Sequence, residues 1–129
     1  MASGSFTFPT GDTYILGRIE WTSTSNGAVA NTSLVKATLS FRKSSSSTSA
    51  TTGNFTGSIT IDGTTTNLSA HITLNPNNSY VTVGSAQKTV AHNSDGTKTC
   101  GIFSSGKIGT LSFNYSNTDK SSCTTKQTA

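Results

Sequence analysis

The residues that could carry acid–base or nucleophilic chemistry are few in this chain of 129 residues, which has five carboxylates and two histidines. Asp62 and Asp95 each precede a glycine, a pattern typical of a tight turn in which the aspartate bonds to the backbone. Glycoside hydrolysis needs two carboxylates that flank one bond, about 5–9.5 Å apart, and Glu20 has no evident partner. His71 and His92 are candidate bases, but no Gly-x-Ser-x-Gly elbow supplies a nucleophile. We therefore expect no enzymatic activity.

The stretch from Val90 to Lys98 offers the best set of metal ligands. Asn93 and Asp95, with backbone carbonyls of the same corner, could bind Ca²⁺, which accepts amide and carboxylate oxygens. However, a calcium site usually gathers several carboxylates, and His92 has no second His or Cys at the spacing of a zinc site. We therefore expect no metal or cofactor, and we expect His92 to bridge the corner to an adjacent strand. We interpret these residues as a structural corner between two strands: His92, Asn93, Asp95 and Gly96.

Aromatic side chains that are exposed on a β-sheet offer flat faces on which sugar rings can stack. Tyr14 and Tyr80 lie out of phase with the apolar residues of their segments, and His71 is out of phase among polar neighbours. Trp21 is in phase with the apolar residues of its segment, so we expect this large side chain to be buried in the core. The candidate glycan contacts are Tyr14, Tyr80 and His71.

These side chains need a scaffold, and the hydrophobic pattern predicts one that is all-β. Apolar and polar residues alternate in short segments with turn residues between them, and no segment longer than ten residues has a helical period. This pattern predicts a single antiparallel β-sandwich, either a jelly roll or immunoglobulin-like. The polar runs 22–33 and 43–54 are expected to be loops. Strands are expected at 13–21, 34–42, 55–61, 68–74, 79–91, 97–103 and 107–115.

The sandwich domain is expected to span residues 1–115, because a polar tail without strand pattern follows at 116–129. This tail either frays or contacts a neighbouring subunit. The residues that share the inward phase of the predicted strands form the expected core: Ile15, Ile19, Trp21, Val35, Leu39, Phe41, Ile59, Ile61, Leu68, Ile72, Leu74, Val81, Val83, Leu111 and Phe113.

The composition suits such a sandwich and argues against several classes of protein. The 22 serines and 25 threonines can fill solvent-facing strand positions. The net charge is +4, but the basic residues are dispersed and only Arg42 and Lys43 are adjacent, so we expect no nucleic-acid partner. No apolar run approaches the roughly 18 residues of a membrane span, and the first residues do not resemble a signal peptide. The pairing state of Cys100 and Cys123 stays open.

Two segments resemble a known family. Val90-Ala91-His92-Asn93-Ser94-Asp95-Gly96-Thr97-Lys98 resembles the V-x-H-N-x-D-G-T-K segment of a family of minor structural proteins from tailed phages (siphoviruses). Ile19-Glu20-Trp21 and Val29-Ala30-Asn31-Thr32-Ser33-Leu34-Val35 resemble the other recurring segment of that family, a Trp-bearing strand followed by A-N-x-S-x-V. The resemblance covers roughly residues 13–103. The biochemical function of this family is poorly defined.

The resemblance implies a non-enzymatic virion protein, either a head decoration or a tail-associated protein, which is exposed on the particle. Such a protein assembles in the host cytoplasm and needs no secretion signal or disulfides. We expect its partners to be other virion proteins, further copies of itself and host-envelope glycans. Residues 104–115 are expected to form the last strand, at an edge where unpaired backbone groups invite a neighbouring subunit. The alternative is a carbohydrate-binding or adhesin-like module from a secreted multidomain protein.

Overall fold

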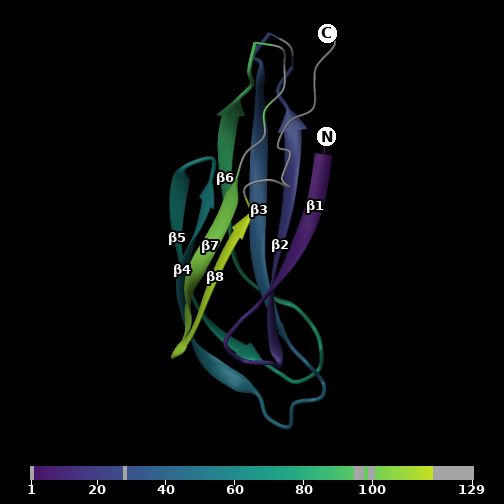
Figure 1. Cartoon of the computed structure of the whole chain (residues 1–129), viewed down its shortest axis with the longest axis vertical. Helices are drawn as coiled ribbons and strands as arrows, with labels where there is room; N and C mark the ends of the chain where they lie inside the picture. The colour runs from purple at the N-terminus through teal and green to yellow at the C-terminus, as the bar shows by residue number, and fades with distance from the viewer. Residues whose placement is uncertain (1, 28, 95–97, 99–100, 118–129) are drawn as a thin grey trace.

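The computed structural model describes residues 2–27, 29–94, 98 and 101–117, and in these ranges every regular element is a β-strand. Eight strands form two four-stranded antiparallel sheets that pack against each other, with the strands along the long axis of the molecule (Figure 1). The predicted antiparallel β-sandwich is therefore confirmed. No helix in these ranges is long and apolar enough to span a membrane. The strands are β1 (Ala2–Pro9), β2 (Ile15–Ser25), β3 (Thr32–Lys43), β4 (Thr51–Ile61), β5 (Thr64–Leu74), β6 (Val81–Ala91), β7 (Ile102–Ile108) and β8 (Leu111–Asn117).

The chain crosses between the two sheets three times. The first sheet has the order β1-β2-β3-β6, and the second sheet has the order β5-β4-β7-β8. The chain therefore builds three neighbouring strands, crosses to form the β4–β5 hairpin, returns to pair β6 with β3, and crosses again to β7 and β8. β8 is an edge of the second sheet, as expected for the last strand, whereas β7 is internal.

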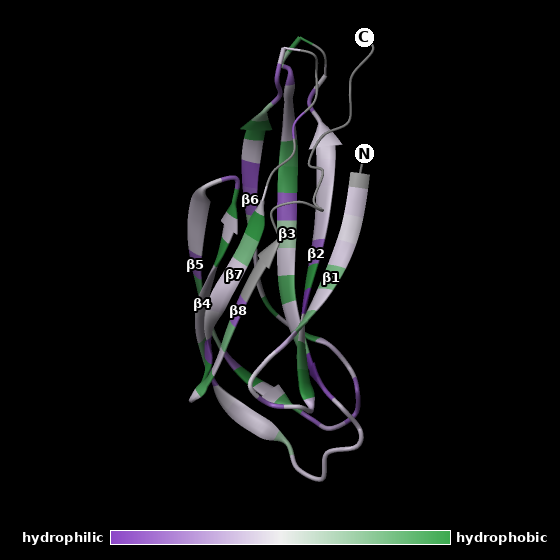
Figure 2. Ribbon diagram, viewed as in Figure 1, coloured by the Kyte–Doolittle hydropathy of each residue, from purple (hydrophilic) through white to green (hydrophobic). Residues whose placement is uncertain are grey.

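The core lies between the sheets and is built by the alternation that the sequence shows. Twelve of the fifteen predicted core residues are buried, and the other three, Leu68, Val81 and Leu111, are partly buried and pack against the core. Hydrophobic and hydrophilic bands follow one another along β3 in the ribbon coloured by hydropathy (Figure 2). The core also includes buried residues outside the predicted set: Phe8, Ala37, Phe55, Ala86, Val90, Ile102 and Ile108.

Four phenylalanines join the two sheets at the centre of the core. Phe8 and Phe41 come from the first sheet, and Phe55 and Phe113 come from the second. The ring centroids of Phe41 and Phe113 are 5.0 Å apart, and those of Phe55 and Phe113 are 5.9 Å apart. Phe8 lies 6.1 Å from Phe41 and 5.7 Å from Phe113. These separations are those of favourable aromatic pairs, so the cluster fixes how the sheets face each other.

Strand β1 was not predicted, and it is held by two aromatic rings that cover glycines on the neighbouring strand. Phe8 of β1 lies over Gly17 of β2, where an added Cβ would be 2.1 Å from the Phe8 Cζ atom. In the reverse direction, Trp21 of β2 lies over Gly4 of β1, where an added Cβ would be 2.8 Å from the Trp21 Nε1 atom. An aromatic ring that covers a cross-strand glycine compensates for the missing side chain.

Several predicted boundaries are wrong, and buried polar residues explain two of them. β2 continues to Ser25 and β3 begins at Thr32, so half of the expected loop 22–33 is strand. Ser23 and Ser33 are fully buried at inward positions there, and the hydrophobic pattern does not mark them. β3 also reaches Lys43 and β4 begins at Thr51, which shortens the expected loop 43–54.

The end of the described chain also differs from the prediction. The expected strand 107–115 is broken by a turn at Gly109, which has a φ of 59°, a value that favours glycine. The expected strand 97–103 falls partly outside the described residues, and β7 begins at Ile102. Cys100, Cys123 and the tail beyond residue 117 also lie outside them.

Candidate functional site

The three candidate glycan contacts do not form one site. His71 lies on the outer face of the second sheet, exposed, with its Nδ1 atom 2.8 Å from the Asn54 Oδ1 atom. These two residues line a shallow depression of about 350 Å³ together with Thr56 and Ser69. Tyr80 contacts side chains of the first sheet, on the opposite side of the sandwich. His71 and Tyr80 therefore cannot contact the same sugar ring.

Tyr80 is packed between two arginines. The Arg18 guanidinium lies 3.7 Å from the centre of the Tyr80 ring, and Arg42 Nε donates a hydrogen bond to the Tyr80 hydroxyl at 3.3 Å. Arg18 also forms an ion pair with Glu20 at 2.9 Å, and Arg42 Nη1 donates to Asn78 Oδ1. One face of the Tyr80 ring is thus already occupied by a cation, which leaves less of it for a sugar.

Tyr14 is exposed, with 43% of its surface accessible. Its backbone N–H donates to Asp12 Oδ1 at 2.8 Å, and its carbonyl accepts from the Ser44 N–H at 2.8 Å. The Thr10 hydroxyl contacts the same turn, because it donates to the Ile15 carbonyl at 2.9 Å. Tyr14 therefore stands on a well-bonded turn at one end of the sandwich.

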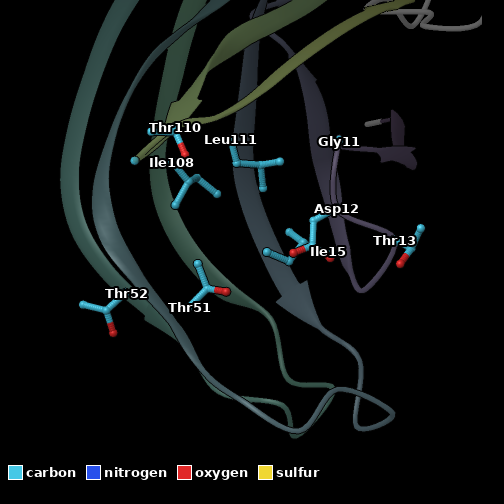
Figure 3. A pocket seen from close by; sticks show the side chains of 10 residues that line it. Gly11, Asp12, Thr13, Ile15, Thr51, Thr52, Ile108, Thr110 and Leu111 are labelled. Carbon is cyan, nitrogen blue, oxygen red and sulfur yellow. The ribbon is translucent and has the colours of Figure 1, made fainter.

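A cleft that we call the end cleft opens beside this turn. It has a volume of about 800 Å³ and lies between the β1–β2 turn, the start of β4 and the β7–β8 turn. Figure 3 shows Ile15, Thr51, Ile108 and Leu111 around the space, with Thr13 and Thr52 at its two sides. The end cleft thus combines aliphatic surface with threonine hydroxyls. Its lining residues are Gly11, Asp12, Thr13, Ile15, Thr51, Thr52, Ile108, Gly109, Thr110 and Leu111.

A lysine that sequence reasoning did not single out lies next to the end cleft. Lys43 is 4% exposed, and its Nζ atom donates a hydrogen bond to the Thr51 hydroxyl at 2.8 Å. Within the described ranges, no carboxylate forms an ion pair with this ammonium group. The sequence does contain a signal, because Lys43 is in phase with the inward residues Val35 to Phe41 of its strand.

The expected structural corner lies near the start of β3, at the opposite end of this strand from Lys43 and the end cleft. Its contacts join residues of the two segments that resemble the phage family, 29–35 and 90–98, which we call the family-like segments. The His92 N–H donates to the Asn31 carbonyl at 2.8 Å, and the Asn31 side-chain amide donates to the Asn93 carbonyl at 3.0 Å. His92 is buried, and its Nε2 atom lies 2.6 Å from the hydroxyl of the fully buried Ser33. His92 thus bridges to strand β3. Asp95 and Gly96 lie outside the described residues.

The three carboxylates of the described residues serve structural contacts. Asp12 accepts a backbone N–H of its turn, and Glu20 pairs with Arg18. Asp62 lies 3.8 Å from both Lys88 and Lys98, and Lys88 also donates to the Asp62 carbonyl at 2.7 Å. No group of three or more His, Cys, Asp or Glu residues that could hold a metal ion occurs among the described residues. The arrangement around the end cleft can bind a polar ligand by hydrogen bonds and aliphatic contacts.

Comparisons with known proteins were made at three levels. The chain is matched by no protein-family model, no curated protein and no solved structure.

Proposed function

We propose that this chain is a non-enzymatic structural protein of a phage virion, displayed on the head or tail, which adheres to host-surface glycans through the end cleft. The observation that carries the proposal is the lining of this cleft, where aliphatic side chains lie next to threonine hydroxyls and Asp12. Ligand sites are typically concave and mostly apolar, with a few polar groups that fix the ligand. A sugar ring has a C–H face for the partly buried Leu111 and hydroxyls for the threonines.

Tyr14 extends this surface beyond the cleft. It stands between Thr13 and Ile15, which both line the cleft, and its ring is exposed. An exposed tyrosine supplies a flat apolar face and a polar hydroxyl at low cost in conformational entropy. An oligosaccharide could therefore occupy the cleft with one ring and contact Tyr14 with the next.

The virion assignment is supported by the two family-like segments. Their residues Asn31, Ser33, His92 and Asn93 contact each other at the end of the sandwich opposite the cleft. Among the described residues, β8 is an edge strand, which can offer backbone groups to a neighbouring virion subunit, and we propose that several copies act together on the particle, assembled in the host cytoplasm. Multiple copies would raise a weak glycan affinity through avidity.

The binding test uses a substitution that fills the cleft. Thr110 is exposed at the mouth, so Thr110→Trp should block the cleft without a change in the core. Thr64→Trp, at an exposed position in the β4–β5 hairpin, is the matched control. In calorimetric titrations with cell-envelope oligosaccharides, we expect Thr110→Trp to lower the affinity by about tenfold or more, equivalent to about 1.4 kcal/mol. Equal affinities of the two variants would contradict the glycan site.

The virion assignment needs a separate measurement. Mass spectrometry of purified phage particles should detect peptides of this chain. If the sequence is found instead inside a larger secreted protein, the adhesin-like alternative holds and the virion assignment fails.

A further inference from the structure

The buried ammonium group of Lys43 is not explained by the packing around it. Its side chain comes from the last residue of β3, on the inward face, opposite Ile15 of β2. Among the described residues it has one hydrogen-bond partner, the neutral hydroxyl of Thr51. An ammonium group carries three N–H donors, so two donors have no acceptor there.

A buried charge without a counter-charge is costly. Desolvation of an ammonium group costs several kcal/mol in general, and a single neutral hydroxyl offsets little of that. A methionine would fill the same space without this cost. The preceding residue, Arg42, is only partly buried and contacts polar partners on the outer face. A charged side chain at this end of β3 can therefore be accommodated on the outer face of the sheet. The inward position of Lys43 therefore suggests that its charge has a function.

Lys43 is not itself among the residues that line the end cleft, but two of its neighbours are. Thr51, which accepts its hydrogen bond, and Ile15, its cross-strand neighbour, both line the cleft. A ligand anion in the cleft would supply the counter-charge that the chain itself does not. Asp12, on another wall, would repel a bare anion but accept hydrogen bonds from ligand hydroxyls.

Building on the glycan-binding function proposed above, we propose that the end cleft selects an acidic glycan. Lys43 binds its anionic oxygen, from a sugar carboxylate or a phosphodiester, and Asp12 and the threonines bind neighbouring hydroxyls. The net charge of +4 attracts such polymers from a distance. Both ligand sources share the anionic oxygen, and the test distinguishes them.

The first test compares three ligands and three variants by isothermal titration calorimetry. The ligands are a uronic-acid oligosaccharide, the same oligosaccharide with its carboxyl groups reduced to alcohols, and a glycerol-phosphate oligomer. The variants are Lys43→Met, Lys43→Arg and the control Lys36→Met, an exposed lysine on the outer face of the same strand. Thermal unfolding confirms that each variant is folded.

We expect the wild type and Lys36→Met to bind one of the two acidic ligands more tightly than the neutral one. Lys43→Met should lose at least about 30-fold of that affinity, the lower end of the cost of removing one partner of a buried charge pair. Lys43→Arg should retain the preference. The acidic ligand that binds identifies the source. Equal binding of acidic and neutral ligands, or equal losses in Lys43→Met and Lys36→Met, would refute the role of Lys43 and leave glycan binding intact.

A second test does not depend on any glycan. Sodium acetate and sodium phosphate are titrated at constant ionic strength against sodium chloride, while amide resonances are followed by NMR. We expect saturable shifts at Thr51, Ile108 and Thr110 in the wild type and none in Lys43→Met. If these shifts occur but no glycan binds, the anion site stands and the proposed adhesion fails. If no shifts occur in the wild type, the anion site is refuted.

Discussion

The contact between Phe8 and Gly17 yields a sharp prediction about how β1 is attached. An alanine at position 17 would place its Cβ 2.1 Å from Cζ, 2.2 Å from Cε2 and 2.8 Å from Cε1 of Phe8. The Phe8 ring cannot swing away freely because Phe41 and Phe113 pack against it. Overpacking of this kind costs about 1–3 kcal/mol, so we expect Gly17→Ala to lower the free energy of unfolding by that amount.

Phe8→Leu should relieve this clash, because leucine lacks all three ring atoms. Alone it loses two aromatic contacts at about 0.5–1.5 kcal/mol each, a total of about 1–3 kcal/mol. In the Phe8→Leu background, Gly17→Ala should cost almost nothing, so the double variant should be about 1–3 kcal/mol more stable than the sum of the single changes predicts. This coupling is measured by urea unfolding, followed by the fluorescence of Trp21, the only tryptophan of the chain.

Gly4→Ala is the control for this double-mutant cycle. Gly4 meets the Trp21 ring rather than Phe8, and four residues of strand separate it from Phe8 by about 13 Å. Its cost should therefore add to that of Phe8→Leu within about 0.5 kcal/mol. If Gly17→Ala is equally costly with Phe8 and with Leu at position 8, then Phe8 does not cover Gly17, and the account of β1 is wrong.

Other predictions concern the core, the corner and the turn beside the cleft. Leu39→Ala removes a fully buried side chain and should lower the free energy of unfolding, measured with urea, by about 2–5 kcal/mol. Leu34→Ala, at an exposed position, should change it by less than about 0.5 kcal/mol. A neutral result for Leu39→Ala would contradict the register of β3. Ser33→Ala leaves the buried His92 ring without its hydroxyl partner and should cost about 1–3 kcal/mol, and an unchanged unfolding midpoint would argue against that hydrogen bond. Asp12→Ala removes the acceptor of the Tyr14 N–H and should speed hydrogen exchange of that amide; an unchanged rate would show that the turn does not depend on Asp12.

The local alternation of apolar and polar residues is sufficient to predict a strand where that strand buries one continuous apolar face. β3 shows this best, because Val35, Leu39 and Phe41 alternate with polar residues and are all fully buried. The pattern failed for β1, whose inward positions include Gly4 and whose outward positions are two serines, a threonine and a proline. Its attachment depends on ring–glycine pairs between two strands, Phe8 over Gly17 and Trp21 over Gly4, and no local window of sequence contains that information.

The candidate site was only partly predictable for the same reason. Tyr14 could be named from its phase, but the end cleft is formed by three segments that are distant in the sequence: two turns and the start of β4. Lys43 carried a phase signal, yet its low-complexity surroundings led to the prediction of a loop. Tyr80 was named as an exposed platform, and its contacts with Arg18 and Arg42 arise only when β2, β3 and the segment before β6 lie side by side.

The most direct test of the central claim is a crystal structure with the glycan that binds most tightly in the calorimetric panel. The account predicts a sugar ring in the end cleft, in contact with Thr51 and Leu111, and an adjoining ring near Tyr14. A glycan seated instead beside His71 on the outer face of the second sheet, or on Tyr80, would contradict it.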